Sequence, residues 1–311
     1  MKIFMDGGEG HIITHRMLPY WKKMGISIQL GNPQGCDVHL SYVHLRAPSK
    51  LPKVLRLDSV YYDSDTNYNS RNAGISEAHR RADAVIYQSH FSRSMCEKYL
   101  SPRKKEAKPF VIHNGIDNGW CGKFIEHEGT NIIVTAKWRR HKRLQEIIQL
   151  FLKHYQKYPY THLHIFGLLY QNVPVKHPNI HYYGHVDRKD FMIHHSMADF
   201  TIHLSKKDAC PNSVVEAIGA GIPVITTNAC GGSTEMCEMT EGCIICDGDE
   251  DSIEPCKPYT NAYNILPKIL ENNLLDAMQK VENNKYRVKL PKELSAEYVA
   301  EKYFEVFKSI V

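Results

Sequence analysis

Two carboxylates, Asp208 and Glu216, lie eight positions apart in the stretch from Ser205 to Thr226. A proline between them, Pro211, is tolerated only in the first turn of a helix. Ser213 stands three positions before Glu216, which is the spacing of a capping box. We therefore expect a helix that begins around residues 211 to 213, with Asp208 in the loop before it. The free N–H groups at such a helix start favour anions, phosphates in particular.

Glu216 then has two interpretations. In one, its side chain reaches back to a backbone N–H and caps the helix, which contributes about 1 kcal/mol. In the other, the carboxylate accepts two hydrogen bonds from the vicinal hydroxyls of a ribose, and the N–H groups near Asn212, Ser213 and Val214 hold the attached phosphates. The isolated stretch favours the cap, so neighbouring segments must decide.

A second segment that could bind a ligand runs from Thr135 to Leu144. It contains five Lys and Arg residues where a strand ends and a helix begins. Positive charge at a helix start opposes the helix dipole unless an anion lies between them. A solvated basic loop and a nucleic-acid patch are the alternatives. Because the charges are confined to one strand-to-helix turn, a small polyanion such as a diphosphate fits better, and we assign it to Arg139 and Lys142.

Short apolar runs alternate with helical patterns along most of the chain, which predicts βα units and parallel sheets. A glycine-rich segment, residues 114–129, interrupts the alternation and reads as a linker. The predicted strands before it are 2–5, 26–30, 37–43, 53–57, 84–88 and 110–113, and those after it are 131–136, 162–166, 180–183, 200–204, 223–227 and 243–246.

These elements predict two Rossmann-like domains, residues 1–125 and 126–292, followed by a helix within 293–311. Helices are expected at 11–24, 76–82, 92–100, 144–158, 274–281 and 295–311. Ligands of such sheets bind at the carboxyl ends of the strands, so two facing sheets place a ligand between them.

The composition argues against a disordered or low-complexity protein. The 311 residues are 23% charged and 42% apolar, as in ordinary globular proteins, and the net charge of +5 favours acidic ligands without requiring a nucleic acid. No apolar run reaches about 18 residues and the first residues lack a signal-peptide pattern, so we expect a cytoplasmic protein. Nine scattered cysteines favour reduced thiols. Cys243 and Cys246, with Cys237 and Cys256 nearby, allow a zinc site, but the apolar run around them favours a strand.

Several motifs together resemble family 4 glycosyltransferases of the GT-B architecture. They cover most of residues 110 to 250 in the order expected for that family, while the first hundred residues resemble it mainly in Gly7-Gly8. The motifs are Val-Ile-His-Asn-Gly-Ile-Asp at 111–117, Trp-Arg-Arg-His-Lys-Arg-Leu at 138–144, Ile-Phe-Gly at 165–167, Tyr-Tyr-Gly-His-Val at 182–186, Asp-Ala-Cys-Pro-Asn-Ser-Val-Val-Glu at 208–216 and Gly-Gly-Ser-Thr-Glu at 231–235.

The resemblance implies retaining transfer of a sugar from a nucleotide-diphosphate donor, with no required metal or cofactor. The second glutamate of the family's acidic motif matches Glu216, which would bind the donor ribose. The first is replaced by Asp208, which would lie beside the transferred sugar. Arg139 and Lys142 match the basic pair that holds the diphosphate.

The same resemblance implies that Gly7 and Gly8 let the backbone of the first domain approach the donor, and that the turn ending at Val186 contacts the base. The last helix would cross back onto the first domain. The acceptor, a glycan, a lipid-linked sugar or a protein, is left open, and so is the oligomeric state.

Other readings stay open beside this one. The shorter carboxylate of Asp208 and the small first domain allow a nucleotide-sugar-binding protein with weak or no transfer, and an epimerase of the same architecture is a more distant alternative. Asp58 is a candidate to face the reacting centre. The basic groups at 20–23 and 103–105 allow contact with an anionic membrane, with a solvated surface as the default.

Overall fold

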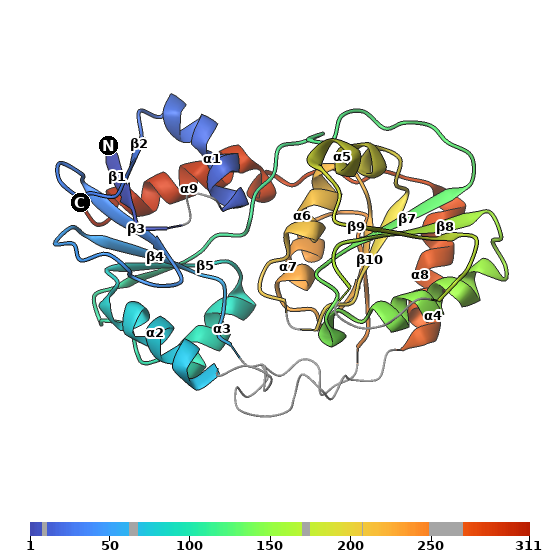
Figure 1. Cartoon of the computed structure of the whole chain (residues 1–311), viewed down its shortest axis with the longest axis horizontal. Coiled ribbons are helices and arrows are strands. Elements are labelled where there is room, and N and C mark those ends of the chain that lie inside the picture. Colours follow the sequence, from blue (N-terminus) through green and yellow to red (C-terminus); the bar gives the residue numbers. More distant parts are fainter. Residues whose placement is uncertain (8–10, 62–67, 170–174, 207, 249–269) are drawn as a thin grey trace. The chain divides into compact units, whose positions relative to one another are not determined.

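The computed structural model describes residues 1–7, 11–61, 68–169, 175–206, 208–248 and 270–311. It divides into two compact units (Figure 1). The first comprises Met1–Asp117 and Lys292–Val311, and the second runs from Asn118 to Pro291 apart from a segment outside the described residues. None of the helices in the described part combines the length and apolar character needed to cross a bilayer.

The first unit contains a six-stranded, fully parallel sheet with the order β2-β1-β3-β4-β5-β6. Alternate residues of its strands point to opposite faces, so Ile3 and Met5 belong to the core under α1 and α9 while Phe4 points to the other face. The elements are β1 Lys2–Met5, α1 Ile12–Lys23, β2 Ser27–Leu30, β3 Val38–Tyr42, β4 Lys53–Leu57, α2 Tyr68–Arg81, β5 Ala84–Tyr87, α3 His90–Tyr99, β6 Lys108–Val111 and α9 Ala296–Lys308.

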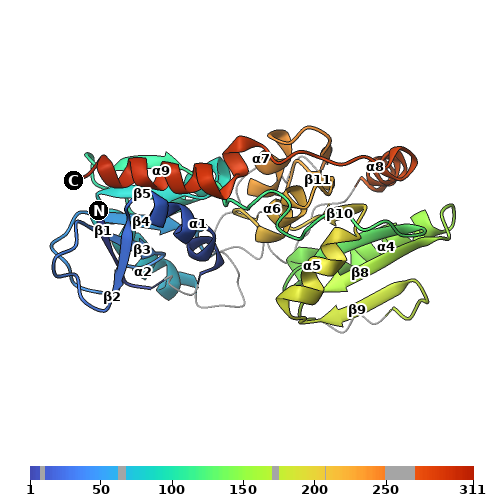
Figure 2. The same cartoon turned by 90° about the horizontal axis from the view of Figure 1, so that it is seen from above.

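Helix α9 returns to the first unit and packs beside α1 (Figures 1 and 2). Its apolar stripe inserts Tyr303 and Phe307 next to Trp21, with ring centroids 5.9 and 5.8 Å from the indole. The Trp21 indole also donates a hydrogen bond of 3.1 Å to the Ala300 carbonyl. The expected return of the last helix to the first domain is confirmed.

The second unit contains another six-stranded parallel sheet, with the order β12-β11-β10-β7-β8-β9. Helices α4 and α8 cover one face, where their apolar residues share one core, and α6 and α7 lie on the other (Figure 1). The elements are β7 Thr130–Thr135, η1 Arg140–Lys142, α4 Leu144–Tyr155, β8 Thr161–Phe166, β9 Ile180–Gly184, α5 Arg188–Ser196, β10 Phe200–His203, α6 Asn212–Gly219, β11 Val224–Thr227, α7 Gly232–Glu238, β12 Ile244–Cys246 and α8 Glu271–Asn284.

Two parallel sheets with alternating helices confirm the predicted fold class. The first unit ends at Asp117, earlier than the expected boundary at residue 125. The reason lies in the next residues, because Gly119 N donates to the Gly219 carbonyl at 2.7 Å and the Trp120 indole to the Glu216 carbonyl at 2.7 Å, both on α6. Which unit serves an acceptor and which a donor stays a prediction.

Candidate functional site

The strand order of the second sheet reverses between β7 and β10, which are neighbours although 64 residues separate Thr135 from Phe200. Chain segments diverge at such a switch point and leave a crevice outside the carboxyl ends of the strands. The turn from Ala136 to Arg143 follows β7, and the loop from Leu204 to Pro211 follows β10. The basic turn and the loop of Asp208 therefore meet at one edge of the sheet.

Lys142 and Asp208 form an ion pair at this edge, in which the Lys142 ammonium donates to Asp208 Oδ2. The Ser205 hydroxyl donates to the same oxygen at 3.2 Å. The main chain of Asp208 is also held, because its carbonyl accepts the Gly232 N–H at 2.8 Å. Asp208 is thus tied to both the basic turn and the start of α7.

This ion pair sets the protonation states around it. Burial raises the pKa of Asp208, but the Lys142 ammonium and the His203 ring lower it by more than burial raises it. The resulting pKa is about 2. Burial lowers the pKa of His203 to about 4 and that of His141 to about 3, and Lys142 adds to both effects. At neutral pH Asp208 is therefore ionised, and the rings of His203 and His141 are neutral.

Helix α6 begins at Asn212, within the predicted range, but the predicted capping box does not form. Pro211 occupies the N-cap position and Ser213 is already the second helical residue. Proline fits there because it has no N–H to leave unpaired. Asn212 and Ser213 are half-buried and Val214 is buried.

Glu216 is the fifth residue of α6 and only 8% exposed. It thus lies beyond the first turn, where a cap would be needed. Its backbone carbonyl binds the Trp120 indole, so the helix is anchored at this residue.

Arg139 is exposed and directly precedes η1, a single helical turn of Arg140–Lys142. Arg143 follows in the left-handed conformation, with φ of 58°, and α4 starts at Leu144. The chain therefore changes direction sharply at Arg143, between Lys142 and the start of α4.

The carboxyl ends of β7, β8 and β9 are pressed together next to this turn. A Cβ on Gly167 would lie 1.9 Å from the Ala136 carbonyl oxygen, and its φ is +100°, so only glycine fits. The Gly167 N–H donates to the Gly184 carbonyl at 2.7 Å. Val186 is half-buried in the turn after Gly184, just before the start of α5. It lies at the same edge of the sheet as Lys142 and Asp208.

Two of the predicted residues belong to the first unit. Gly7 follows β1 and has a φ of +114°, a conformation that favours glycine. Gly8 lies outside the described residues. Asp58 follows β4, and its carboxylate accepts a hydrogen bond of 2.7 Å from the buried guanidinium of Arg56. The structure thus shows Asp58 in an ion pair within its own unit.

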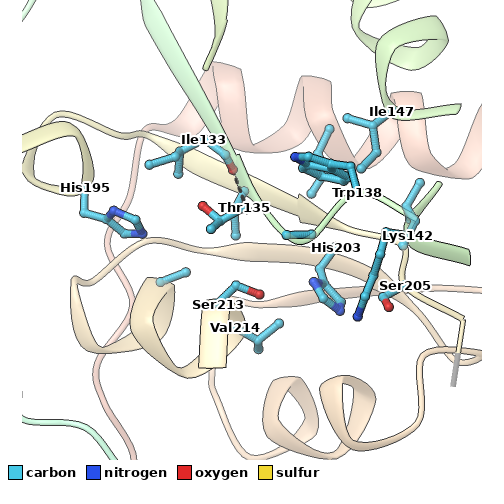
Figure 3. Close-up of a pocket in the computed structure, with 15 residues that line it drawn as sticks. Ile133, Thr135, Trp138, Lys142, Ile147, His195, His203, Ser205, Ser213 and Val214 are labelled. Atoms are coloured by element: carbon cyan, nitrogen blue, oxygen red, sulfur yellow. Dashed lines mark hydrogen bonds between the residues drawn. The ribbon is translucent and has the colours of Figure 1, made fainter. Parts of the chain in front are cut away.

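A narrow pocket of about 10 Å³ opens among β7, β10 and α6, with Lys142, His203, Ser205 and Ser213 in its wall (Figure 3). The Lys142 side chain lies beside the His203 ring. Such a volume holds about one water molecule, so a nucleotide would lie across the strand ends rather than inside the pocket.

His203 and Ser205 were not identified from the sequence. Nε2 of His203 is buried and has no hydrogen-bond partner within the described part of the chain. His203 fell inside a predicted buried strand, and the available signal was a titratable residue near the carboxyl end of an otherwise apolar run. In the described ranges, no group of three or more His, Cys, Asp or Glu side chains is placed to hold a metal ion. The predicted strand at 243–246 is confirmed as β12, and Cys256 lies outside those ranges.

Solved structures with the same architecture cover nearly the whole chain. Sucrose-phosphate synthase from Thermosynechococcus elongatus superimposes with a TM-score of 0.69 at 12% identity, over 99% of this chain and 98% of that one. HepE from Anabaena, in complex with UDP-glucose, gives 0.62 at 14% identity over 99% and 100%. AviGT4, a glycosyltransferase involved in avilamycin A biosynthesis, gives 0.57 at 12% identity over 100% and 98%.

At the level of sequence, no curated protein gives a significant match. Residues 123–254, which carry the whole of the Lys142 and Asp208 site, match the sequence profile of the family described as "Glycosyl transferases group 1". The chain therefore has the GT-B fold, and its second unit carries the group 1 glycosyl transferase signature.

Proposed function

We propose that the protein is a retaining glycosyltransferase that moves a sugar from a nucleotide-diphosphate donor to an acceptor, without a required metal. One observation carries this proposal. The Lys142–Asp208 ion pair lies at the switch point of the second sheet, inside the segment that matches the group 1 glycosyl transferase profile. A cation suited to a diphosphate and a carboxylate suited to a sugar are thereby brought together where such sheets bind ligands.

Lys142 and Arg139 take the diphosphate in this proposal. The charge of the leaving nucleotide diphosphate grows as the sugar bond breaks, and fixed cations at that position stabilise the transition state. Lys142 is held in place before the donor arrives, because Asp208 pairs with its ammonium. The diphosphate would then compete with Asp208 for Lys142.

Asp208 takes the sugar side. With a pKa of about 2 it stays ionised at neutral pH, so it cannot serve as a general acid there. An ionised carboxylate can instead stabilise the positive charge that develops on the sugar ring during transfer. Aspartate is one methylene shorter than the glutamate of the family motif, so the sugar must come closer to the loop.

Glu216 takes the ribose of the donor. It is 8% exposed on α6, and the helix is fixed by the Trp120 hydrogen bond to the Glu216 carbonyl. The N–H groups of Asn212, Ser213 and Val214 at the start of α6 favour the neighbouring phosphates. The turn at Val186 is the proposed contact of the base.

A second candidate is a nucleotide-sugar-binding protein that does not transfer. The observation that favours it is the same ion pair, because Lys142 and Asp208 each neutralise the other in the absence of donor. A donor that failed to separate them would bind without being activated.

The test is a panel of UDP, GDP, ADP and TDP sugars, each assayed for binding, hydrolysis and transfer to acceptor extracts. UDP-glucose comes first because HepE is solved with it. Glu216→Ala and Lys142→Ala are expected to weaken donor binding by about tenfold or more, since hydrogen bonds to charged groups contribute about 1.5 to 3 kcal/mol. Arg140→Ala is the matched control, because this exposed cation stands in the same turn.

Transfer or donor hydrolysis that is lost in Glu216→Ala and unchanged by a metal chelator supports the glycosyltransferase. Tight donor binding with no turnover in any extract favours the binding protein. If no nucleotide sugar binds, both candidates are wrong.

A further inference from the structure

A hollow of about 400 Å³ lies in the first unit, at the amino ends of β4 and β5. Three separate segments converge on it, namely the start of β4, the end of α2 and the loop that precedes β6. Five of its six lining residues are cationic, and the lining comprises Lys53, Arg80, Arg81, Pro102, Arg103 and Lys104.

The described carboxylates near these cations do not balance their charge. Asp83 pairs with Lys104 at 2.6 Å, Glu77 with both Arg80 at 2.8 Å and Arg81 at 3.9 Å, and Glu97 with Arg103 at 2.8 Å. The three carboxylates are not part of the lining, and one of them, Glu97, also pairs with Arg93 at 3.1 Å. The five lining cations therefore outnumber the carboxylates that pair with them by two.

Lys53 shows that these charges are crowded. Its pKa is lowered mainly by burial, and although Asp83 opposes the shift, Lys104 and Arg81 lower the pKa further. The Asp83 carboxylate is already engaged, because it also accepts the Lys53 backbone N–H at 2.8 Å. An anion in the hollow would relieve this repulsion.

The alternative is a basic surface that only water covers. Scattered surface cations on one helix would fit that description, but here the cations come from three segments and surround a concavity. The hollow also lies at the amino ends of the strands, whereas Gly7 lies at the carboxyl end of β1. The hollow is therefore separate from the carboxyl edge of this sheet, where ligands of parallel sheets bind.

We propose that this hollow binds a doubly charged phosphate group, carried either by a soluble phosphate compound or by a lipid headgroup. Guanidinium groups match the oxygens of phosphate in geometry and form strong, charge-assisted hydrogen bonds with them. Arg80, Arg81 and Arg103 supply three guanidinium groups, and Lys53 and Lys104 supply two ammonium groups. A dianion matches the uncompensated charge.

The first arm of the test follows phosphorus NMR line broadening of inorganic phosphate added to the full-length protein at constant ionic strength. Arg81→Gln and Arg103→Gln are each expected to weaken binding about tenfold, because each removes a charged hydrogen-bond donor. Arg71→Gln is the matched control, since it lies on the same helix as Arg81 but outside the lining. Each variant is repeated with Lys142→Ala, which removes a cation of the second unit that could also attract phosphate.

The second arm measures sedimentation with vesicles of phosphatidylcholine alone and of phosphatidylcholine with phosphatidic acid, whose headgroup is a phosphate monoester. Circular dichroism checks that each variant is folded. Broadening that the two pocket variants lose and Arg71→Gln retains supports a soluble phosphate ligand. Sedimentation with the acidic vesicles alone, lost in the same two variants, supports a lipid headgroup. The proposal is overturned if neither probe binds, or if binding is equal in the pocket variants and Arg71→Gln.

Discussion

The Lys142–Asp208 ion pair makes a quantitative prediction about stability. Asp208 has a pKa of about 2 in the folded protein in place of its ordinary 3.8. Because one pKa unit corresponds to about 1.4 kcal/mol, the folded state gains about 2 kcal/mol from the ionised carboxylate. Lys142→Met keeps most of the length of the side chain and removes its charge, which leaves Asp208 buried without its cation. We expect the variant to be about 2 to 4 kcal/mol less stable than the wild type at pH 7.

The lowered pKa of Asp208 also sets the direction in which stability changes with pH. A lowered pKa stabilises the folded state above the ordinary value of 3.8, and this stabilisation disappears as the pH falls from about 4 through about 2. In Lys142→Met burial acts without the ammonium and favours the protonated acid. The difference between wild type and variant should therefore be largest at neutral pH and shrink on acidification.

Urea unfolding followed by tryptophan fluorescence measures this difference. In a Trp21→Phe background the remaining tryptophans, Trp120 and Trp138, both lie in the second unit and report on it alone. Asp208→Asn in combination with Lys142→Met should recover about 2 kcal/mol, which is the coupling expected of a double-mutant cycle. Arg140→Met is the control. A neutral-pH loss below about 0.5 kcal/mol, or one that does not shrink in acid, would refute the reasoning.

Three further predictions concern single substitutions. Gly167→Ala would place a Cβ 1.9 Å from the Ala136 carbonyl oxygen, so it should lower the free energy of unfolding by about 3 kcal/mol or prevent folding. Gly184→Ala meets no atom within 4 Å and should lower it by about 1 kcal/mol. Thermal unfolding distinguishes the two variants. Phe307→Ala empties part of the core of the first unit and should lower its unfolding free energy by about 3 to 5 kcal/mol, against little change in the second unit. Trp120→Phe removes one hydrogen bond to α6 and should cost the second unit about 1 kcal/mol in urea unfolding, and an unchanged midpoint would contradict that anchoring role.

Most strands were predictable because they are buried in parallel sheets, although the edge strands β2 and β6 are only partly buried. Such strands read as short apolar runs between glycine, proline and polar residues, and each of the twelve predicted runs overlaps a strand. Helices α5 and α7 were missed for different reasons. The sequence of α5, Arg188–Ser196, is rich in charged and histidine residues, and α7, Gly232–Glu238, is short and starts at a glycine that reads as a turn.

The roles predicted for the site residues stay predictions, and the contacts between these residues could not be read from the sequence. Lys142 and Asp208 were each assigned to a ligand, but their ion pair joins residues 66 positions apart. The pair exists because β7 and β10 are neighbours in the sheet, and strand order is not contained in an alternation of strands and helices. For the same reason the sequence did not identify His203, because its ring lies beside Lys142 only when β7 and β10 are neighbours.

The discontinuity of the first unit has a consequence for synthesis on the ribosome. Helix α9 supplies Tyr303 and Phe307 to the core around Trp21, yet it is translated after the whole second unit. At about 5 to 20 residues per second, the roughly 170 residues between Asp117 and Lys292 take on the order of 10 to 35 seconds to appear. The nascent first unit must wait through that interval with the α9 side of its core uncovered, while every described residue of the second unit emerges before α9.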